Sequence, residues 1–147
     1  MESTVRQILQ EKGGEVWSVS PETTVFETLQ LLTDKDIGAV VVSDAGRLVG
    51  IFSERDYVRQ AVKDIETIKH KPVSLFMTRE VFTIKPDETV KDCMLIMTAR
   101  HIRHLPVMDG DNLVGIITIG DVVKQVISDQ TKLLEEMENY ISGRYGR

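Results

Sequence analysis

The sequence predicts a mixed α/β (α+β) fold with two β-α-β-β-α repeats related by a pseudo-twofold axis, each a small sheet with two helices. Residues 16–60 align with residues 81–125 at one offset of 65 residues and without a gap. Both copies hold the same order of extended, helical and β-branched segments. A unit of about 60 residues buries too little surface to be stable alone, so we expect the two copies to pack face to face around one core.

The duplication rests on identical residues spread over the whole alignment. They include Val16/Val81, Pro21/Pro86, Thr24/Thr89, Ile37/Ile102, Val42/Val107, Gly50/Gly115 and Asp56/Asp121. A looser match upstream pairs Val5, Ile8 and Leu9 with Val73, Phe76 and Met77. Gly13 and Gly14 then form a short insertion that only the first copy has.

Each copy opens with an extended piece, residues 16–19 or 81–84, that ends close to a proline, where helix is disfavoured. The helix that follows has apolar residues at spacings of three and four, which predicts one buried stripe. This stripe consists of Val25, Leu29 and Leu32 in the first copy and of Val90, Met94 and Met97 in the second.

Two β-branched runs come next in each copy, residues 37–42 with 48–52 and residues 102–107 with 113–117. Asp, Gly and Asn residues separate the runs, which predicts a hairpin. A last helix opens near Asp56 and near Asp121. We expect it to bury Val58 with Ala61 or Val62, and Val123 with Val126 or Ile127.

The chain therefore divides into residues 1–66, the first repeat with an N-terminal helix, and residues 67–127, the second repeat. Residues 128–147 form a C-terminal amphipathic helix and tail, with Gly143 as its stop. Leu133, Met137, Tyr140 and Ile141 form the apolar stripe of this helix. Such a stripe docks on its own body or on a partner subunit.

Composition excludes several classes of function. Eighteen Lys and Arg against 23 Asp and Glu give a net charge of −5, which argues against broad nucleic-acid binding. Cys93 is the single cysteine, so neither an intramolecular disulfide nor a four-cysteine zinc site can form. No apolar run approaches the roughly 20 residues that span a bilayer, and the first twelve residues lack the apolar centre of a secretory signal. We expect a cytoplasmic protein without membrane contact.

The most informative motif is a hydroxyl residue followed three positions later by aspartate, Ser53 with Asp56 and Thr118 with Asp121. Each pair follows a strand and opens a helix, and its spacing is that of a capping box. Thr24 and Thr89 have the same spacing to an acid at the other helix starts, so spacing alone predicts four caps. The alternative is functional, because such an aspartate can accept two hydrogen bonds from a ribose diol and the helix N-terminus suits a phosphate.

The duplicated pattern resembles a tandem pair of cystathionine-β-synthase (CBS) domains, a Bateman module, over residues 5–127. Three features carry the resemblance: Gly50-Ile51-Phe52-Ser53-x-x-Asp56, Gly115-Ile116-Ile117-Thr118-x-x-Asp121, and Ile102-Arg103-His104-Leu105-Pro106-Val107. It implies a sensor that binds AMP, ADP, ATP, NAD(H) or S-adenosylmethionine in clefts between the repeats. The ligand residues that it implies are Ser18, Ala39, Val40, Ser53, Glu54 and Asp56 in the first copy, and Thr83, Arg103, His104, Leu105, Pro106, Thr118, Ile119 and Asp121 in the second.

By this resemblance the two aspartates take the ribose hydroxyls, and Ser53 and Thr118 lie near ribose or phosphate. Ser18 and Thr83 would line the adenine pocket, and the backbone of the second strand, around residues 39–41 and 104–106, would read the adenine edge.

The two clefts differ in charge. Arg100, His101, Arg103 and His104 in the second copy stand where the first has Lys35, Asp36, Gly38 and Ala39. A guanidinium binds phosphate and Asp36 would repel it, so we favour phosphate binding for Arg103, while Arg100 stays open between binding and solvation. The first cleft is either empty or takes another ligand. Glu54 could accept a hydrogen bond from a second ribose, so a dinucleotide such as NAD(H) stays among the candidate ligands.

No residue pattern predicts catalysis or a metal site. His101 and His104 lack a third ligand, and Cys93 lies on a helix without a base, which favours a packed thiol. We therefore predict a regulatory module for signal transduction and energy sensing, with no catalytic cofactor. It would form a homodimer through Val122, Val126 and the tail stripe and act on an unidentified effector protein. The alternative is a structural or assembly module that binds no ligand and acts through dimerisation.

Overall fold

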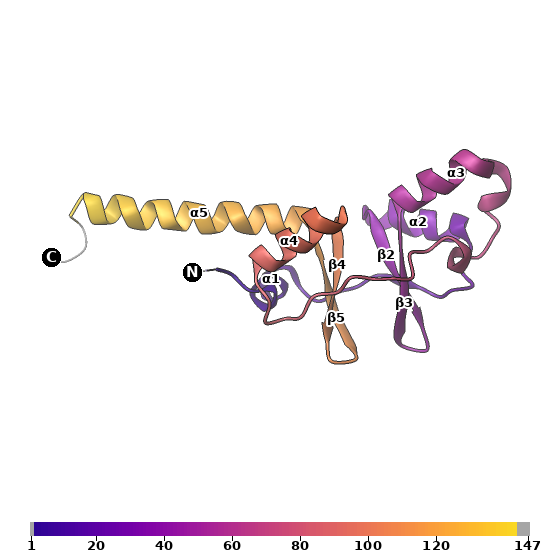
Figure 1. Ribbon diagram of the computed structural model, residues 1–147, viewed down its shortest axis with the longest axis horizontal. Helices are drawn as coiled ribbons and strands as arrows, with labels where there is room; N and C mark the ends of the chain where they lie inside the picture. Colours follow the sequence, from indigo (N-terminus) through magenta and orange to yellow (C-terminus); the bar gives the residue numbers. More distant parts are fainter. Residues whose placement is uncertain (1, 144–147) are drawn as a thin grey trace.

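The computed structural model describes residues 2–143 and confirms two β-α-β-β-α repeats (Figure 1). The elements in chain order are α1 (Val5–Lys12), β1 (Ser18–Val19), α2 (Val25–Lys35), β2 (Ala39–Asp44), β3 (Arg47–Ser53), α3 (Glu54–Ile68), the 3-10 helix η1 (Val73–Leu75), α4 (Val90–Arg100), β4 (His104–Asp109), β5 (Asn112–Thr118) and α5 (Ile119–Ile141). The two hairpins point to the same side of the molecule, and α2, α3, α4 and α5 lie on the other side. Residues 1 and 144–147 of the predicted N- and C-terminal segments lie outside the described residues.

The two sheets are equivalent in their hairpins and differ in their first strand. In the first repeat β1 pairs in parallel with β2, and β2 pairs antiparallel with β3. In the second repeat the extended piece at residues 81–84 contributes a single parallel bridge, between Ile84 and Val107, to the pair β4-β5. Equivalent register shifts occur after Val42 and after Val107, so the hairpins share one local twist.

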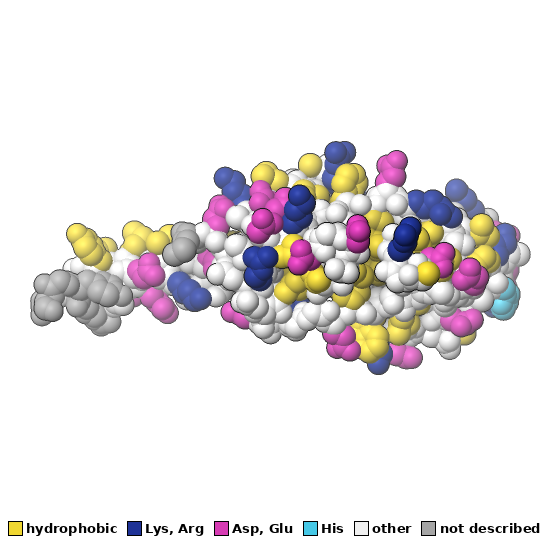
Figure 2. Space-filling view, turned by 90° about the horizontal axis from the view of Figure 1, so that it is seen from below, with side chains coloured by type: hydrophobic (Ala, Val, Ile, Leu, Met, Phe, Trp, Pro, Cys, Tyr) yellow, Lys and Arg dark blue, Asp and Glu magenta, His cyan; other side chains and the backbone are white. Residues whose placement is uncertain are grey.

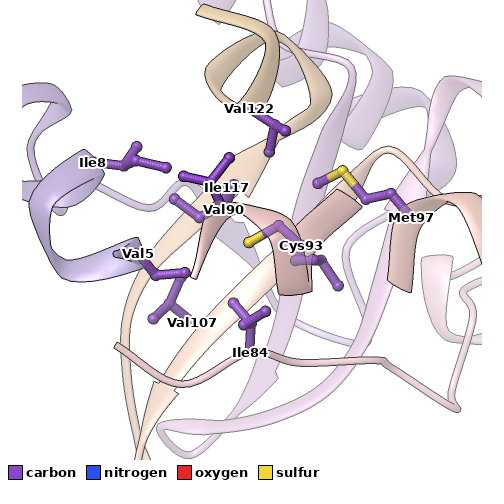
Figure 3. Close-up of a cluster of buried hydrophobic side chains, with 10 residues drawn as sticks. Val5, Ile8, Ile84, Val90, Cys93, Met97, Val107, Ile117 and Val122 are labelled. Carbon is purple, nitrogen blue, oxygen red and sulfur yellow. The ribbon is translucent and has the colours of Figure 1, made fainter. Parts of the chain in front are cut away.

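Each repeat buries its own apolar cluster, and each cluster is completed from the other half of the chain. In the second repeat Val5 and Ile8 of α1 lie against Val107 and Ile117 (Figure 3). The first cluster contains Ile68, Val73 and Met77, from the end of α3 and the segment that follows it, packed with Val25, Phe52 and their neighbours. The N-terminal helix therefore packs on the second repeat, although the sequence places it before the first.

Backbone hydrogen bonds show that this exchange is symmetric. Three pairs of bonds match across the repeats. Val25 N donates to Lys71 O as Val90 N does to Ser3 O, both at 2.9 Å. Val73 N donates to Thr23 O at 2.7 Å as Val5 N does to Glu88 O at 2.8 Å, and Ser74 N donates to Pro21 O at 3.1 Å as Arg6 N does to Pro86 O at 2.9 Å. The looser sequence match of residues 5–9 with residues 73–77 therefore reflects equivalent structural positions. The predicted boundary between the two repeats, after residue 66, stays a prediction.

The expectation for the buried face of the last helix in each repeat was wrong for Val58 and Val123, whereas the alternatives Ala61 and Val126 are partly buried. Val58 and Val62 are 60% and 84% exposed, and Val123 and Ile127 are 50% and 59% exposed. The preceding positions face inward: Val122 is 1% exposed, and Tyr57 and Val126 are partly buried against the apolar clusters. The caps at Ser53 and Thr118 fix where each helix starts, and one residue of shift turns a side chain by about 100°.

The predicted C-terminal helix is the second half of one long element. Helix α5 runs without a break from Ile119 to Ile141 and extends beyond the body of the molecule (Figure 1). Apolar side chains line the extension, which does not dock on its own body (Figure 2). They are Leu133, Leu134, Met137, Tyr140 and Ile141, all exposed. Gly143, at φ 76°, follows the helix and confirms the predicted stop.

No helix within residues 2–143 combines the length and apolar character needed to cross a bilayer.

The exchange predicts that an α1 substitution destabilises the second cluster. Truncating the buried Ile8 to alanine removes packing there and is expected to lower the free energy of unfolding by about 2–5 kcal/mol in urea denaturation. Hydrogen exchange should accelerate at Ile117 more than at Phe52. The control is Gln10→Ala on the exposed side of the same helix. Equal losses from both substitutions would contradict the packing of α1 on the second repeat.

Candidate functional site

The two predicted aspartates occupy equivalent corners, where β3 meets α3 and β5 meets α5. Oδ2 of Asp56 accepts from Ser53 N at 2.9 Å, and Oδ2 of Asp121 accepts from Thr118 N at 2.8 Å. The hydroxyls of Ser53 and Thr118 accept in return from the aspartate amides, both at 3.1 Å. The capping interpretation is confirmed at both corners.

The two remaining caps, at Thr24 and Thr89, are also confirmed. Their hydroxyls accept from the amides of Glu27 and Asp92, both at 3.1 Å. All four predicted caps therefore form, and capping by itself does not distinguish Asp56 and Asp121 from an ordinary helix start.

Capping leaves acceptor capacity on both aspartates, because a carboxylate offers about four lone-pair positions on its two oxygens. Oδ1 of Asp56 accepts one long bond, 3.4 Å, from the Thr78 hydroxyl. Oδ1 of Asp121 accepts no hydrogen bond from any residue within 2–143. The side chain of Asp121 is 20% exposed. A capped aspartate here can therefore still receive a hydroxyl from a ligand.

The repeats meet where β2 and β4 begin. A Cβ on Gly38 would lie 3.4 Å from Nε2 of His104, so the imidazole packs against the first repeat. Arg55 crosses the junction, where its Nη1 donates to the His101 carbonyl at 2.8 Å. The fold thus brings the predicted residue His104 of the second copy beside the start of β2 in the first, which holds Ala39.

The other predicted residues fall into two groups. Ala39, Val40, Leu105 and Pro106 are buried in the second strands and can offer a ligand little beyond their backbone. Ser18, Thr83, Glu54, Arg103 and Ile119 are exposed around the corners and strand ends. Within the described residues no hydrogen bond joins Ser18 or Thr83 to Asp56 or Asp121, so their role in an adenine pocket stays a prediction.

The two arginines of the basic cluster in the second copy differ in their contacts. The Arg100 guanidinium lies over the Phe82 ring at 4.7 Å, and the equivalent Lys35 amine lies over Trp17 at 4.3 Å. Trp17 and Phe82 thus hold cations in both repeats. The exposed Arg103 forms no side-chain hydrogen bond or ion pair within the described part of the chain.

Lys12 is a site residue that the sequence analysis missed. Its Nζ donates to Oδ2 of Asp121 at 2.6 Å and to the Ile116 carbonyl at 2.8 Å. Lys12 ends α1, and Gly14 follows so close to β5 that a Cβ there would lie 2.8 Å from the Val114 carbonyl oxygen. The two-glycine insertion was the signal, since paired glycines allow such a close approach.

Burial and charge make His104 a neutral residue. Burial lowers the pKa of its imidazole below the usual 6.5, and Lys12 and Arg103 lower it further, whereas Asp121 acts in the opposite direction. A neutral imidazole keeps one donor and one acceptor nitrogen.

The thiol of Cys93 is packed, as predicted. Cys93 is buried in the second cluster, and burial raises its pKa to about 12. Within residues 2–143 no three His, Cys, Asp or Glu side chains lie where they could hold a metal ion.

Two hollows of about 460 and 450 Å³ lie on the helices rather than beside the aspartates. The first lies between α2 and α3 and includes Phe26, Tyr57 and Ile65. The second lies along the exposed side of α5, at Ile119, Val123 and Ile127. Neither contains Asp56 or Asp121.

A family comparison agrees with this architecture. The sequence model described as the CBS domain matches residues 5–63 and again residues 65–128. The chain belongs to the CBS domain family. It carries two such domains in tandem, and its fold is similar to those of solved CBS-domain pairs.

Three of these solved structures are informative. The CBS-domain containing protein ATU1752 from Agrobacterium tumefaciens is 40% identical, with a TM-score of 0.81 over 83% of this chain and 98% of that one. CBSX2, solved in complex with AMP, is 27% identical, with a TM-score of 0.71 over 87% and 98% of the chains. The CBS domain pair of MJ0100, in complex with 5′-methylthioadenosine and S-adenosyl-L-methionine, is 25% identical, with a TM-score of 0.76 over 88% and 99%.

The lowered pKa of His104 predicts a pH dependence of stability. The unfolded chain takes up a proton near pH 6.5 and the folded chain does so only at lower pH, so folded stability falls as the pH drops below about 6.5. The slope from one such group is at most about 1.4 kcal/mol per pH unit. Urea denaturation at pH 7.5 and 5.5 should show a smaller loss for His104→Gln than for the wild type, with the exposed His70→Gln as control. Equal losses in all three proteins would contradict a buried neutral imidazole.

Proposed function

We propose that this CBS-domain pair is a regulatory module that binds an adenine nucleotide (AMP, ADP, ATP or NAD(H)) between its repeats and signals to an effector protein. The carrying observation is the Asp121 corner, where the cap leaves Oδ1 without a partner in the described chain and the Arg103 carbonyl accepts from Ile119 N at 2.9 Å, so the exposed Arg103 lies beside the start of α5. A ribose hydroxyl can donate to that oxygen, and the guanidinium can bind a phosphate. The AMP complex of CBSX2 and the S-adenosyl-L-methionine complex of MJ0100 support an adenosyl ligand.

Signalling would act on the junction between the repeats. Only a few polar contacts cross it near the site, among them Arg55 to the His101 carbonyl. A ligand held by residues of both repeats would favour one relative orientation, because it binds that orientation more tightly. An effector protein would then distinguish the two orientations. The predicted cytoplasmic location is part of this proposal.

Binding without catalysis fits the groups near the site. Burial raises the pKa of the Cys93 thiol to about 12 inside the second cluster, and the His104 imidazole packs against Gly38. Cys93 is therefore not the activated nucleophile that covalent catalysis requires.

A second candidate function, assembly without a ligand, is favoured by one specific observation. Both aspartates satisfy their own helix caps, and the hollows lie on the outer helices. Calorimetric titration of the full chain with AMP, ATP and NADH separates the two functions. Heat of binding supports the sensor, and its absence with all three compounds supports the assembly module.

We also propose a homodimer, through a surface that differs from the one predicted. Val122 packs inside its own repeat, so the contact moves one position along α5 to Ile119, Val123 and Ile127. The stripe continues on the same helix through Leu134, Met137 and Ile141, so successive apolar residues of the seam are three, four or seven positions apart. Val58 and Val62 present the equivalent surface on α3.

Nucleotide binding by Asp121 can be separated from its role in capping. Asp121→Ala removes both the cap and the ribose acceptor, and the cap alone is worth about 1 kcal/mol of stability. We expect AMP affinity in calorimetry to fall at least about tenfold, since a hydrogen bond to a charged group is lost. The matched control is Asp92→Ala, which removes the same capping geometry at α4 and should leave AMP affinity unchanged. Unchanged affinity in Asp121→Ala would leave this residue a cap only.

The dimer surface predicts the effect of one buried charge. Val123→Asp places a carboxylate in the apolar seam, and we expect sedimentation velocity to show a monomer at concentrations where the wild type is a dimer. Leu75→Asp, at an equally exposed apolar residue of η1, should leave the dimer intact. A monomeric wild type, or a dimeric Val123→Asp, would refute this surface.

A further inference from the structure

The two aspartate corners have different third partners. In the first repeat Thr78 fills this position: its amide donates to the Ile51 carbonyl at 2.8 Å and its hydroxyl to Oδ1 of Asp56 at 3.4 Å. In the second repeat the equivalent carbonyl, on Ile116, and Asp121 both accept from the Lys12 ammonium. A neutral threonine at one corner is thus replaced by a cation at the other.

The fold holds Lys12 in place from both sides. Leu9, one turn earlier on α1, packs so closely on Gly115 of β5 that a Cβ there would lie 2.6 Å from its side chain. Gly13 caps the helix with its amide on the Leu9 carbonyl at 2.7 Å and takes φ 96°, which favours glycine. Gly14 then lies against the Val114 carbonyl. Lys12 therefore belongs to the Asp121 corner as part of the exchanged helix packing.

The surroundings add to this difference in charge. Lys12 pairs with Asp121, and Arg103, beside the start of α5, helps burial and Lys12 to lower the pKa of His104. Around Asp56 the residue equivalent to Arg103 is Gly38, the helix opens with Glu54, Thr78 carries no charge, and the guanidinium of Arg55 is engaged by the His101 carbonyl. An uncompensated aspartate repels a phosphate a few ångströms away, and a paired one does so far less.

The ammonium of Lys12 retains a donor for a ligand. An ammonium has three N–H groups, and the structure uses two of them, on Ile116 O and Asp121 Oδ2. Its side chain is 30% exposed, and the third N–H has no partner within residues 2–143. Oδ1 of Asp121 stays available at the same time. One corner can thus offer an acceptor to a sugar hydroxyl and a charged donor to a phosphate oxygen.

We propose that Lys12 makes the second cleft selective for adenosine compounds that carry a 5′-phosphate over uncharged or sulfonium-bearing ones. The proposal rests on adenine nucleotide binding as the function of this site. The first cleft, closed by Thr78 and bordered by Glu54, lacks this preference. The two clefts of one chain then respond to different classes of adenosyl ligand.

The experiment measures the affinity ratio of AMP to adenosine by calorimetry on the full chain. The wild type is expected to prefer AMP. Lys12→Met should lower this preference about tenfold, because a charged donor is lost, and Lys12→Arg should retain it. Lys91→Met, at an exposed lysine of α4, is the matched control and should leave the ratio unchanged.

Each outcome bears on the proposal. An unchanged ratio in Lys12→Met, with AMP still bound by the wild type, overturns the role of Lys12 and leaves nucleotide binding intact. A wild type that binds neither compound overturns nucleotide binding and the role of Lys12 together. Circular dichroism verifies the fold of each variant; if Lys12→Met does not fold, Lys12→Gln, which keeps donors without the charge, carries the same expectation.

Discussion

The rest of the structure depends on the crossed completion of two apolar clusters. Neither repeat fills its own interior: α1 supplies Val5 and Ile8 to the second, and the segment between α3 and α4 supplies Val73 and Met77 to the first. Separating the repeats would expose both clusters, so their relative position follows from burial of apolar surface. The same crossing carries Lys12 to the corner of Asp121 and Thr78 to the corner of Asp56.

The candidate site and the helix caps use the same atoms for two purposes. Each corner needs an acid to satisfy the free amides at a helix start, and Oδ2 of that acid does so. The other oxygen is left at a strand end where the repeats meet. The cap thereby holds the carboxylate in one orientation before any ligand arrives, which lowers the entropy that binding has to overcome.

Duplication followed by local change accounts for the difference between the corners. Equivalent caps, register shifts and cation–aromatic pairs recur in both repeats. The differences concentrate around the aspartates, where Lys12 replaces Thr78 and Arg103 replaces Gly38. A shared scaffold with divergent polar groups can therefore present two chemically distinct sites.

The duplication, the order of elements and the four caps can be predicted from the amino-acid sequence, because they depend on local spacing and on residues close together in the chain. The corners of Asp56 and Asp121 are located in the same way. The buried face of each last helix, the contact of Arg100 with Phe82 and the ion pair of Lys12 with Asp121, 109 residues away, are known only once the chain is folded. These contacts join residues far apart in the chain, so they depend on how the two halves pack.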